Sequence, residues 1–322
     1  MIPASSTPGR DGAAGVPRAG VDAVVVSHNT RELLGRCLAA LQPECRHIIV
    51  VDAASTDGSA ETLAAHVSAD DVLALRHNRG FGAAANAGIA AATSDFVLLL
   101  NADAWPLPGA VAKLVTKAAL DSSIGVMAPR LLNPDGSLQR SIFGYPRTPL
   151  SLAAWVASPA VISNAFRAWR FMQSSTASLL HDGSHAIAGG DFPAGAALLI
   201  RKEAWIEVDG FDEAFFMYSE ETDFCQRLRQ LDWKVDLCPA ASFVHVGAAS
   251  TGQVRGAMDR EQLRSYVRFF AKHHGVAQAD RARKLIACAL RVRALTSSGG
   301  QRAHYRQLAG WLQATELRVI LA

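Results

Sequence analysis

The sequence has no long apolar run, and its residues 1–20 do not include the apolar segment that is typical of a signal peptide. No window reaches the roughly 18 to 20 consecutive apolar residues that a membrane-spanning helix needs. Its most apolar stretch beyond position 128, at 150–162, is broken by Ser158 and Pro159, and we expect a buried helix there rather than a segment touching a bilayer. Residues 1–20 are rich in Gly, Pro, Ala and Ser, which is typical of a disordered lead-in.

Cysteine is scarce and charge is balanced. The five cysteines are widely spaced without a CxxC pair, so the sequence predicts neither a zinc ribbon nor a disulfide framework, but reduced thiols in the cytoplasm. The formal net charge is only +3, which argues against a nucleic-acid partner. Arginines are numerous over 260–318, where we expect a solvated basic face; peripheral contact with the cytosolic face of an anionic membrane and a homodimer are the alternatives.

Short apolar runs alternate with helical patterns as far as position 128. The expected strands are 21–26, 47–51, 72–75, 96–100 and 125–127. Helices are expected between them, at about 30–41, 59–66, 82–92 and 108–120. This alternation predicts an α/β fold with a Rossmann-like, mostly parallel central sheet flanked by helices, whose ligands bind beyond the carboxyl ends of the strands.

The remainder of the chain is less regular. Residues 129–187 carry aromatics and prolines without a clear period, and a strand pattern returns at 194–200. A helix with acids at its start follows near residue 220. From about residue 259 the pattern is helical, which predicts a helical C-terminal extension.

The tripeptide Asn101-Ala102-Asp103 follows a predicted buried strand. A carboxylate at this point could bind Mg²⁺ or Mn²⁺, since these ions take one or two protein carboxylates together with phosphate oxygens. The alternative is that Asp103 only caps the helix that starts near Pro106. By itself the tripeptide favours the cap.

Two further strand ends carry nucleotide-binding candidates. Asp52 can accept hydrogen bonds from a nucleoside or can shape the turn that follows it, and the two interpretations are about equal. The turn at 78–82 offers glycines and a helix N-terminus to a phosphate. It imitates a dinucleotide-binding fingerprint, but that motif belongs after the first strand, where Ser27-His28-Asn29 has no glycine.

Three acids in four residues, at 220–223, precede a helical stretch. Acids at a helix start are often only dipole partners. The preceding segment 215–218 is strongly apolar, so we expect these acids to enter a shielded cleft that raises their pKa, as a general base requires. Glu220 and Glu221 are separated by about 100° on a helix, so only one should face a substrate.

His245 closes an apolar run at 241–244. Such a histidine is more often structural than a ligand of a metal or phosphate.

In their order, these motifs closely resemble family 2 glycosyltransferases, most of all the rhamnosyltransferase-like branch. The resemblance runs from about Val21 to Thr251 through segments 24–29 (VVVSHN), 49–52 (IVVD), 55–59 (STDGS), 78–82 (NRGFG), 98–103 (LLLNAD), 129–137 (PRLLNPDGS), 210–213 (GFDE), 215–218 (FFMY), 220–223 (EETD) and 244–245 (VH). It implies a GT-A fold over 21–255, with a nucleotide-binding half at about 21–128 and an acceptor-binding half at about 129–255. Residues 256–322 would then form the extension.

The resemblance also implies roles for particular residues. Asp103 and His245 would hold the metal, and Glu221 would be the general base, usually an aspartate, with Glu220 and Asp223 as alternatives. Arg130 and Gln139 lie in the segment expected to approach the acceptor, although an ion pair accounts equally well for Arg130. The nucleotide contacts would be Ser27, Asn29, Asp52, Asn78, Gly80, Asn86 and Asn101.

Such an enzyme transfers a sugar from a nucleotide diphosphate to a hydroxyl and inverts the anomeric centre of that sugar. Possible donors include dTDP-rhamnose. The acceptor would be a glycan or lipid-linked oligosaccharide in cell-surface polysaccharide synthesis. Two other functions stay open. A catalytically silent nucleotide-binding scaffold is favoured only by Asn101 and by glutamate at position 221. A nucleotidyltransferase would want a glycine-rich basic loop after the first strand, which 28–30 does not supply.

Overall fold

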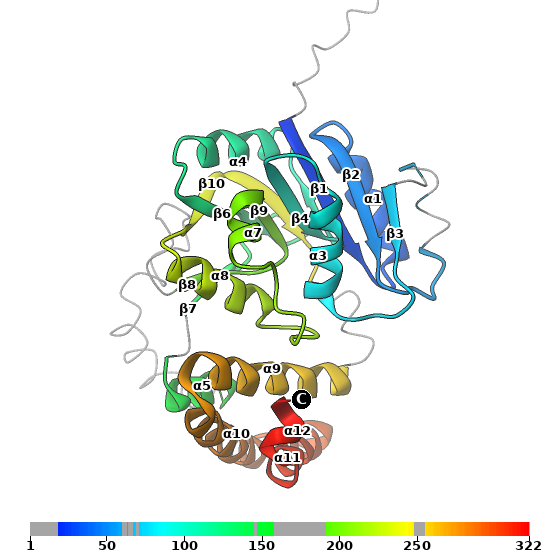
Figure 1. The fold of residues 1–322 in the computed structure, drawn as a ribbon. Coiled ribbons are helices and arrows are strands. Elements are labelled where there is room, and N and C mark those ends of the chain that lie inside the picture. The colour runs from blue at the N-terminus through cyan, green and yellow to red at the C-terminus, as the bar shows by residue number, and fades with distance from the viewer. Residues whose placement is uncertain are drawn as a thin grey trace, which may run out of the picture.

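A computed structural model of the chain describes residues 19–59, 63, 67–68, 71–144, 147–157, 191–247 and 255–321. Outside these residues lie most of the expected lead-in, most of the expected helix at 59–66 and all of 158–187. The described part consists of a central sheet covered by helices on both faces, with a group of helices packed beneath it (Figure 1). The sheet belongs to residues 19–245 and most of the lower helices follow residue 255.

The central sheet has eight strands in the order β3-β2-β1-β4-β9-β6-β10-β5. Within it, β3, β2, β1 and β4 are mutually parallel, as are β6 and β10, while β9 and β5 run antiparallel to their neighbours. The predicted mostly parallel sheet is therefore confirmed. The strands are β1 (Ala19–Ser27), β2 (Cys45–Asp52), β3 (Val72–Ala74), β4 (Phe96–Asn101), β5 (Ala104–Pro106), β6 (Ile124–Leu132), β9 (Ala197–Arg201) and β10 (Lys234–His245).

Helices cover both faces of this sheet. On one face, α1 (Arg31–Leu41) and α4 (Ala110–Ala119) bury leucines, valines and alanines in one apolar cluster. On the other, α3 (Phe81–Ala91), α7 (Lys202–Glu207) and α8 (Glu220–Gln230) pack into a second cluster. Because β1 lies between these clusters, Val24 and Val25 are both fully buried although they point to opposite faces.

The C-terminal helices have an apolar core of their own. This core joins α5 (Pro149–Ala157), α9 (Arg255–His274), α10 (Val276–Thr296), α11 (Gly299–Ala314) and α12 (Leu317–Leu321). The predicted helical C-terminal extension is thus confirmed, and α5, with Leu152 fully buried, joins it from the middle of the chain. Within the described ranges, no helix combines the length and apolar character needed to cross a membrane.

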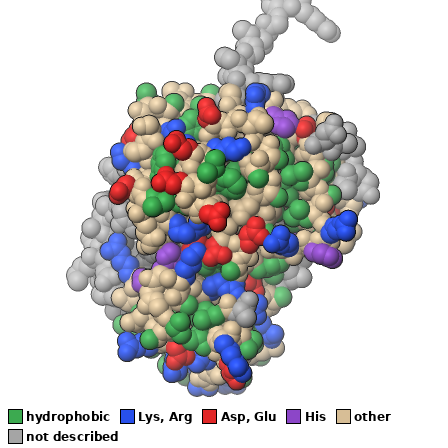
Figure 2. Space-filling model, viewed as in Figure 1, with side chains coloured by type: hydrophobic (Ala, Val, Ile, Leu, Met, Phe, Trp, Pro, Cys, Tyr) green, Lys and Arg blue, Asp and Glu red, His purple; other side chains and the backbone are tan. Residues whose placement is uncertain are grey.

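Some arginines of this extension bond to the backbone instead of facing solvent. Arg268 is nearly buried and donates to backbone oxygens of Ala214 and Leu321. Arg283 and Arg293 likewise donate to backbone oxygens, within the helical group. On the side of the molecule that Figure 2 presents, acidic and basic side chains are interspersed rather than gathered into a field of one sign.

The region expected to be irregular after residue 128 contains more strand than the sequence predicts. Strand β6 continues through Pro129 to Leu132, and its pairing with β10 shifts register between Cys238 and Ser242, opposite Pro129. Proline has no N–H for the ladder, so a strand with an irregularity can accommodate it there. A separate two-stranded sheet pairs β7 (Ile142–Gly144) with β8 (Asp191–Pro193).

Cysteines in the structure are free thiols. Four are buried and Cys288 is exposed.

Gly88 tests the packing of α3 against the sheet. A Cβ added there would lie 2.3 Å from Cγ1 of Val24 and 2.9 Å from Cγ2 of Val51. We expect Gly88→Ala to lower the free energy of unfolding by about 1–3 kcal/mol because it overpacks a full core. Gly310→Ala is the matched control: it lies in α11 with nothing within 4 Å of its added Cβ. It should raise stability by about 0.5–1 kcal/mol. Urea unfolding that gave both variants the same sign would contradict this packing.

Candidate active site

The carboxyl ends of three strands meet at one edge of the sheet. Ser27 of β1 lies opposite Asp52 of β2, and Val26 lies opposite Asn101 of β4. Ser27 and Asp52 are buried there. The parallel pairing thus brings together three of the predicted nucleotide-binding residues from points far apart in the sequence.

Two of the predicted nucleotide ligands also shape the turns at this edge. The Asp52 carboxylate accepts hydrogen bonds from the backbone N–H and hydroxyl of Ser55, at 3.2 and 2.5 Å. Asn29, whose φ is 52°, donates its N–H to Ser55 and accepts from the N–H of Thr56. The turn-forming interpretation of Asp52 therefore has direct contacts, and nucleotide binding by these residues stays a prediction.

The glycine turn before α3 is fixed by a contact from far along the chain. Gly80 has φ +96°, and a Cβ on it would lie 2.1 Å from the carbonyl oxygen of Phe216. Phe81 donates its N–H to that oxygen, and Asn78 accepts from the N–H of Gly80. The close approach of two backbone segments thus explains glycine here without a phosphate.

Asn86 is fully occupied by protein contacts. Its Oδ1 accepts from the Phe211 N–H and from the indole N–H of Trp205, and its Nδ2 donates to the Phe211 carbonyl and to Glu213. Three of these bonds tie α3 to the loop before α8, and the fourth ties it to Trp205 of α7. The predicted nucleotide contact of Asn86 therefore has a structural alternative at the same residue.

Asp103 and His245 lie together at the far side of the same edge. Strand β10 pairs with β5, which starts one residue after Asp103, and Oδ1 of Asp103 is 3.4 Å from Nε2 of His245. Asp103 is only 6% exposed. The two predicted metal ligands therefore lie side by side, although they stand in distant parts of the sequence.

Gln139 sets the tautomer of His245. Its Nε2 donates to Oδ1 of Asn133 and to the carbonyl of His245, so its Oε1 is the atom that lies 2.8 Å from Nδ1 of His245. Nδ1 must then carry a proton, which leaves Nε2 as an acceptor facing the Asp103 carboxylate. Two acceptors at this separation need either a proton, on the ring or on the carboxyl, or a metal ion between them.

The side chains of Asp103 and His245 suit a metal ion that is also bound by a substrate. No group of three or more His, Cys, Asp or Glu that could hold a metal occurs among the described residues. If a metal ion binds here, one carboxylate and one imidazole would be the protein's ligands, and phosphate oxygens and water would complete the coordination, as Mg²⁺ and Mn²⁺ commonly require. Gln139 supplies the outer hydrogen bond that typically orients a metal-bound histidine.

The acids of α8 point to different surroundings. A Cβ at Gly82 of α3 would lie 3.7 Å from Cβ of Glu220, whereas one at Gly195 would lie 3.5 Å from Cβ of Glu221. The neighbour of Gly195, Ala196, accepts the N–H of Asn101. Glu221 is thus next to the segment that borders the 101–103 tripeptide, as expected if only one of the two glutamates faces the substrate.

Burial changes the protonation of both glutamates. It raises the pKa of Glu221 to about 7, and it raises that of Glu220 well above its ordinary value, with the charge of Glu221 adding to the effect. Each has a buried Oε2 without a hydrogen-bond partner. A carboxyl that is neither ion-paired nor fully ionised at neutral pH is suited to accept a proton.

Asp223 has the opposite environment. It is fully buried, and its oxygens lie 2.7 Å from Nε of Arg227, 2.8 Å from Nζ of Lys272 and 2.7 Å from Nε2 of His273. Burial alone would raise its pKa, but the His273 bond and the two cations outweigh it and lower the pKa. This geometry argues against the expected alternative that Asp223 is the base, because its carboxylate is neutralised and shielded.

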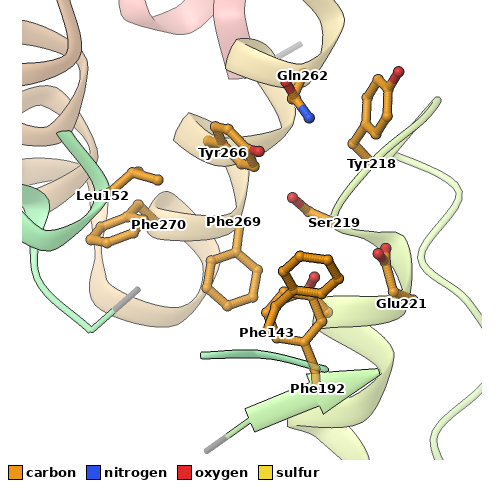
Figure 3. A pocket seen from close by; sticks show the side chains of 11 residues that line it. Phe143, Leu152, Phe192, Tyr218, Ser219, Glu221, Gln262, Tyr266, Phe269 and Phe270 are labelled. Atoms are coloured by element: carbon orange, nitrogen blue, oxygen red, sulfur yellow. The ribbon is translucent and has the colours of Figure 1, made fainter. Parts of the chain in front are cut away.

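The predicted acceptor residues lie on the metal side of the site. Gln139 binds His245, as described above, and Arg130 lies in β6 opposite Ser242 of β10. Glu221 instead borders a cavity whose far wall is α9 (Figure 3). No site residue was predicted in α9, where the aromatic run near residues 266–270 was the available indication.

The chain is similar to known glycosyltransferases. A family model described as glycosyl transferase family 2 matches residues 22–150. An N-acetylglucosaminyl-diphospho-decaprenol L-rhamnosyltransferase of Mycobacterium tuberculosis is 25% identical over 288 residues, which cover 78% of this chain and 84% of that protein. The rhamnosyltransferase WbbL of Escherichia coli K12 is 30% identical over 82 residues, which cover 26% of this chain and 31% of that one.

A solved structure resembles the fold of almost the whole chain. The mannosyltransferase PcManGT from Pyrobaculum calidifontis, in complex with GDP-Man and Mn²⁺, matches with a TM-score of 0.53 and 18% identity. The match covers 94% of this chain and 83% of that one. At this identity the likeness concerns the fold alone.

The raised pKa of Glu221 predicts a pH-dependent stability. The unfolded chain releases this proton near pH 4.5 and the folded chain near pH 7, so stability falls as pH rises between these values. We expect Glu221→Gln to be more stable than the parent protein by about 1–3 kcal/mol above pH 7, and by much less at pH 4.5. Glu32→Gln, at an exposed position, is the control and should differ by less than about 0.5 kcal/mol throughout. A pH-independent difference for Glu221→Gln in urea titrations would contradict the assigned burial.

Proposed function

Because the chain belongs to glycosyltransferase family 2, has the GT-A fold and is an enzyme that transfers a sugar from a nucleotide sugar, we propose an inverting, metal-dependent mechanism for it. In this mechanism Asp103 and His245 hold a divalent cation and Glu221 is the general base. The observation that carries the proposal is the pair of facing acceptors on Asp103 and His245, which a divalent cation can bind together.

In the proposed mechanism, the metal site acts on the leaving group. The cation would be Mg²⁺ or Mn²⁺, and its charge would stabilise the negative charge that grows on the departing nucleoside diphosphate. Asp103 and His245 lie near the carboxyl ends of β1, β2 and β4, where open α/β sheets bind nucleotides. Ser27, Asp52 and Asn101 would therefore contact the nucleotide on the side next to the metal ligands.

The general base, Glu221, acts on the acceptor. Glu221 takes the proton of the acceptor hydroxyl while the hydroxyl oxygen bonds to the anomeric carbon and the bond from that carbon to the diphosphate breaks. One displacement inverts the anomeric centre and needs no covalent sugar–enzyme intermediate. A pKa of about 7 leaves a substantial fraction of Glu221 ionised at neutral pH while keeping it basic enough to accept the proton. Burial and the neighbouring charge of Glu221 raise the pKa of Glu220 as well.

For the substrates we propose a rhamnosyl donor such as dTDP-rhamnose and a lipid-linked acceptor. The support is the rhamnosyltransferase activity of the Mycobacterium tuberculosis relative, whose match covers most of both chains. The product would enter cell-surface polysaccharide synthesis.

Calorimetry separates the two halves of the site. Titrating the full chain with a panel of nucleotide sugars, in Mn²⁺ or in EDTA, should reveal metal-dependent binding of one donor. Asp103→Ala should abolish that binding because it removes the anionic metal ligand. Glu221→Gln should keep the binding within about threefold, yet lower kcat by about 10²–10⁴ because the base is lost.

Asp95→Ala serves as the control, because it removes an exposed carboxylate at the opposite end of β4 and should leave nucleotide-sugar binding unchanged. If the folded chain binds no nucleotide sugar and no free nucleoside diphosphate, the transferase proposal fails, and a scaffold that binds other partners becomes the better account.

Gln139 provides a second, independent test of the metal site. Gln139→Met keeps the length of the side chain but removes the acceptor that fixes the tautomer of His245. Affinity for Mn²⁺ in the presence of dTDP should fall by about 10–100-fold. Gln313→Met, the same change at an exposed position of α11, should leave it unaltered. Equal Mn²⁺ affinities in the two variants would refute the role of Gln139.

A further inference from the structure

A cavity of about 180 Å³ separates the start of α8 from α9. Glu221 and Ser219 lie on one side of it, and Gln262 and Tyr266 lie on the other (Figure 3). Leu152 of α5 contributes to the α9 side. The catalytic half and the helical extension thus each supply one wall, and the proposed base lies at their junction.

The walls of this cavity combine aromatic faces with a few polar groups. Phe143, Phe192 and Phe269 are among its lining residues, together with Tyr266 and the amide of Gln262. Glu221 is the single ionisable acid or base other than tyrosine among the described lining residues, and neither lysine nor arginine occurs there. A phosphate or carboxylate would meet no cation among these described residues and would be repelled by Glu221. The occupant should therefore be neutral.

The size of the cavity restricts the occupant further. Sites for drug-sized ligands usually enclose about 300–1,000 Å³. A cavity of about 180 Å³ suits one ring rather than an oligosaccharide. A pyranose has an apolar C–H face that can lie on an aromatic ring and a rim of hydroxyls that can reach polar groups, so it matches both components of the wall.

We propose that this cavity binds the terminal, uncharged sugar ring of the acceptor, and that Gln262, Tyr266 and Phe269 of α9 determine which sugar is accepted. The inference rests on the proposed function, in which Glu221 deprotonates an acceptor hydroxyl. A lipid chain is the less favoured occupant, because it would leave the amide of Gln262 and the carboxylate of Glu221 facing hydrocarbon.

The α9 wall is built to be rigid. Residues 262, 266 and 269 follow one face of the helix at spacings of four and three. The same helix is tied to the loop before α8, where Ser265 donates to the carbonyl of Met217 at 2.8 Å and Arg268 donates to that of Ala214. Burial and the nearby charge of Glu221 both raise the pKa of Tyr266, which agrees with its position across from the base. A fixed wall can discriminate between sugars that differ at one hydroxyl.

The test uses small probes and the full chain. The methyl glycosides of glucose, galactose, N-acetylglucosamine and rhamnose are titrated by saturation-transfer NMR in the presence of the nucleotide diphosphate. We expect at least one glycoside to bind. Phe269→Ala should weaken that binding about tenfold or more, because an aromatic face is lost. Gln262→Leu and Tyr266→Phe should change the order of preference within the panel.

Nucleotide-sugar binding should be the same in all three variants as in the parent protein. Leu312→Ala is the matched control: Leu312 is fully buried in the same helical core and is absent from the cavity wall. It should leave glycoside binding unchanged. Because Phe269→Ala removes a nearly buried ring, its folding is checked by thermal unfolding. If Phe269→Ala fails to fold, Gln262→Leu, at a partly exposed position, tests the role of α9 in glycoside binding.

Two results would overturn the proposal. One is unchanged glycoside affinity and preference in folded Gln262→Leu and Tyr266→Phe; the other is displacement of the probes by farnesol, which would assign the cavity to a lipid chain. Failure of the proposed function is distinguishable, since it would abolish nucleotide-sugar binding by the parent protein whatever the glycosides do.

Discussion

The buried carboxylate of Asp223 is the interaction on which the rest of the site depends. It has no exposed surface, and it binds Arg227 within its own helix and Lys272 and His273 of α9. Removing one partner from such a pair commonly costs about 3–5 kcal/mol, because a buried charge is left uncompensated. The helical extension is therefore joined to the helix that carries Glu221, and the position of that helix depends on the extension.

The same arrangement explains why neighbouring acids differ in protonation. Asp223 stays ionised because cations surround it, whereas burial without a cation raises the pKa of Glu221. Tyr218 and Ser219, just before α8, both have left-handed backbone angles, with φ of 68° and 66°. Non-glycine residues adopt such angles only where the surroundings impose them. The direction of the first turn of α8, and with it that of Glu221, is thus imposed by packing rather than by local preference.

The sequence predicted those parts of the molecule that depend on local patterns. Continuous apolar runs identified β1, β2 and β4, and parallel pairing then requires Ser27, Asp52 and Asn101 to meet. It did not predict that β9 would insert antiparallel between β4 and β6, or that β6 would continue through Pro129, because both depend on the pairing partner. The aromatic wall of α9 was missed for the same reason: Tyr266 reaches the site only through contacts with residues much earlier in the chain, such as Glu221.

The loop between α7 and α8 connects the two halves of the site. On the nucleotide side, Asn86 binds Phe211, and Gly80 lies against the backbone of Phe216. On the acceptor side, α9 binds the carbonyls of Ala214 and Met217. Both α3 and α9 are thus fixed to one short segment, which leads directly into Glu221. A transfer reaction requires the attacking hydroxyl and the anomeric carbon to be held within a few tenths of an ångström of a productive separation. In the proposed mechanism, the shared loop would hold the donor and acceptor walls at a constant spacing, so glycine at position 80 and asparagine at position 86 would support catalysis through geometry even where they contact no substrate.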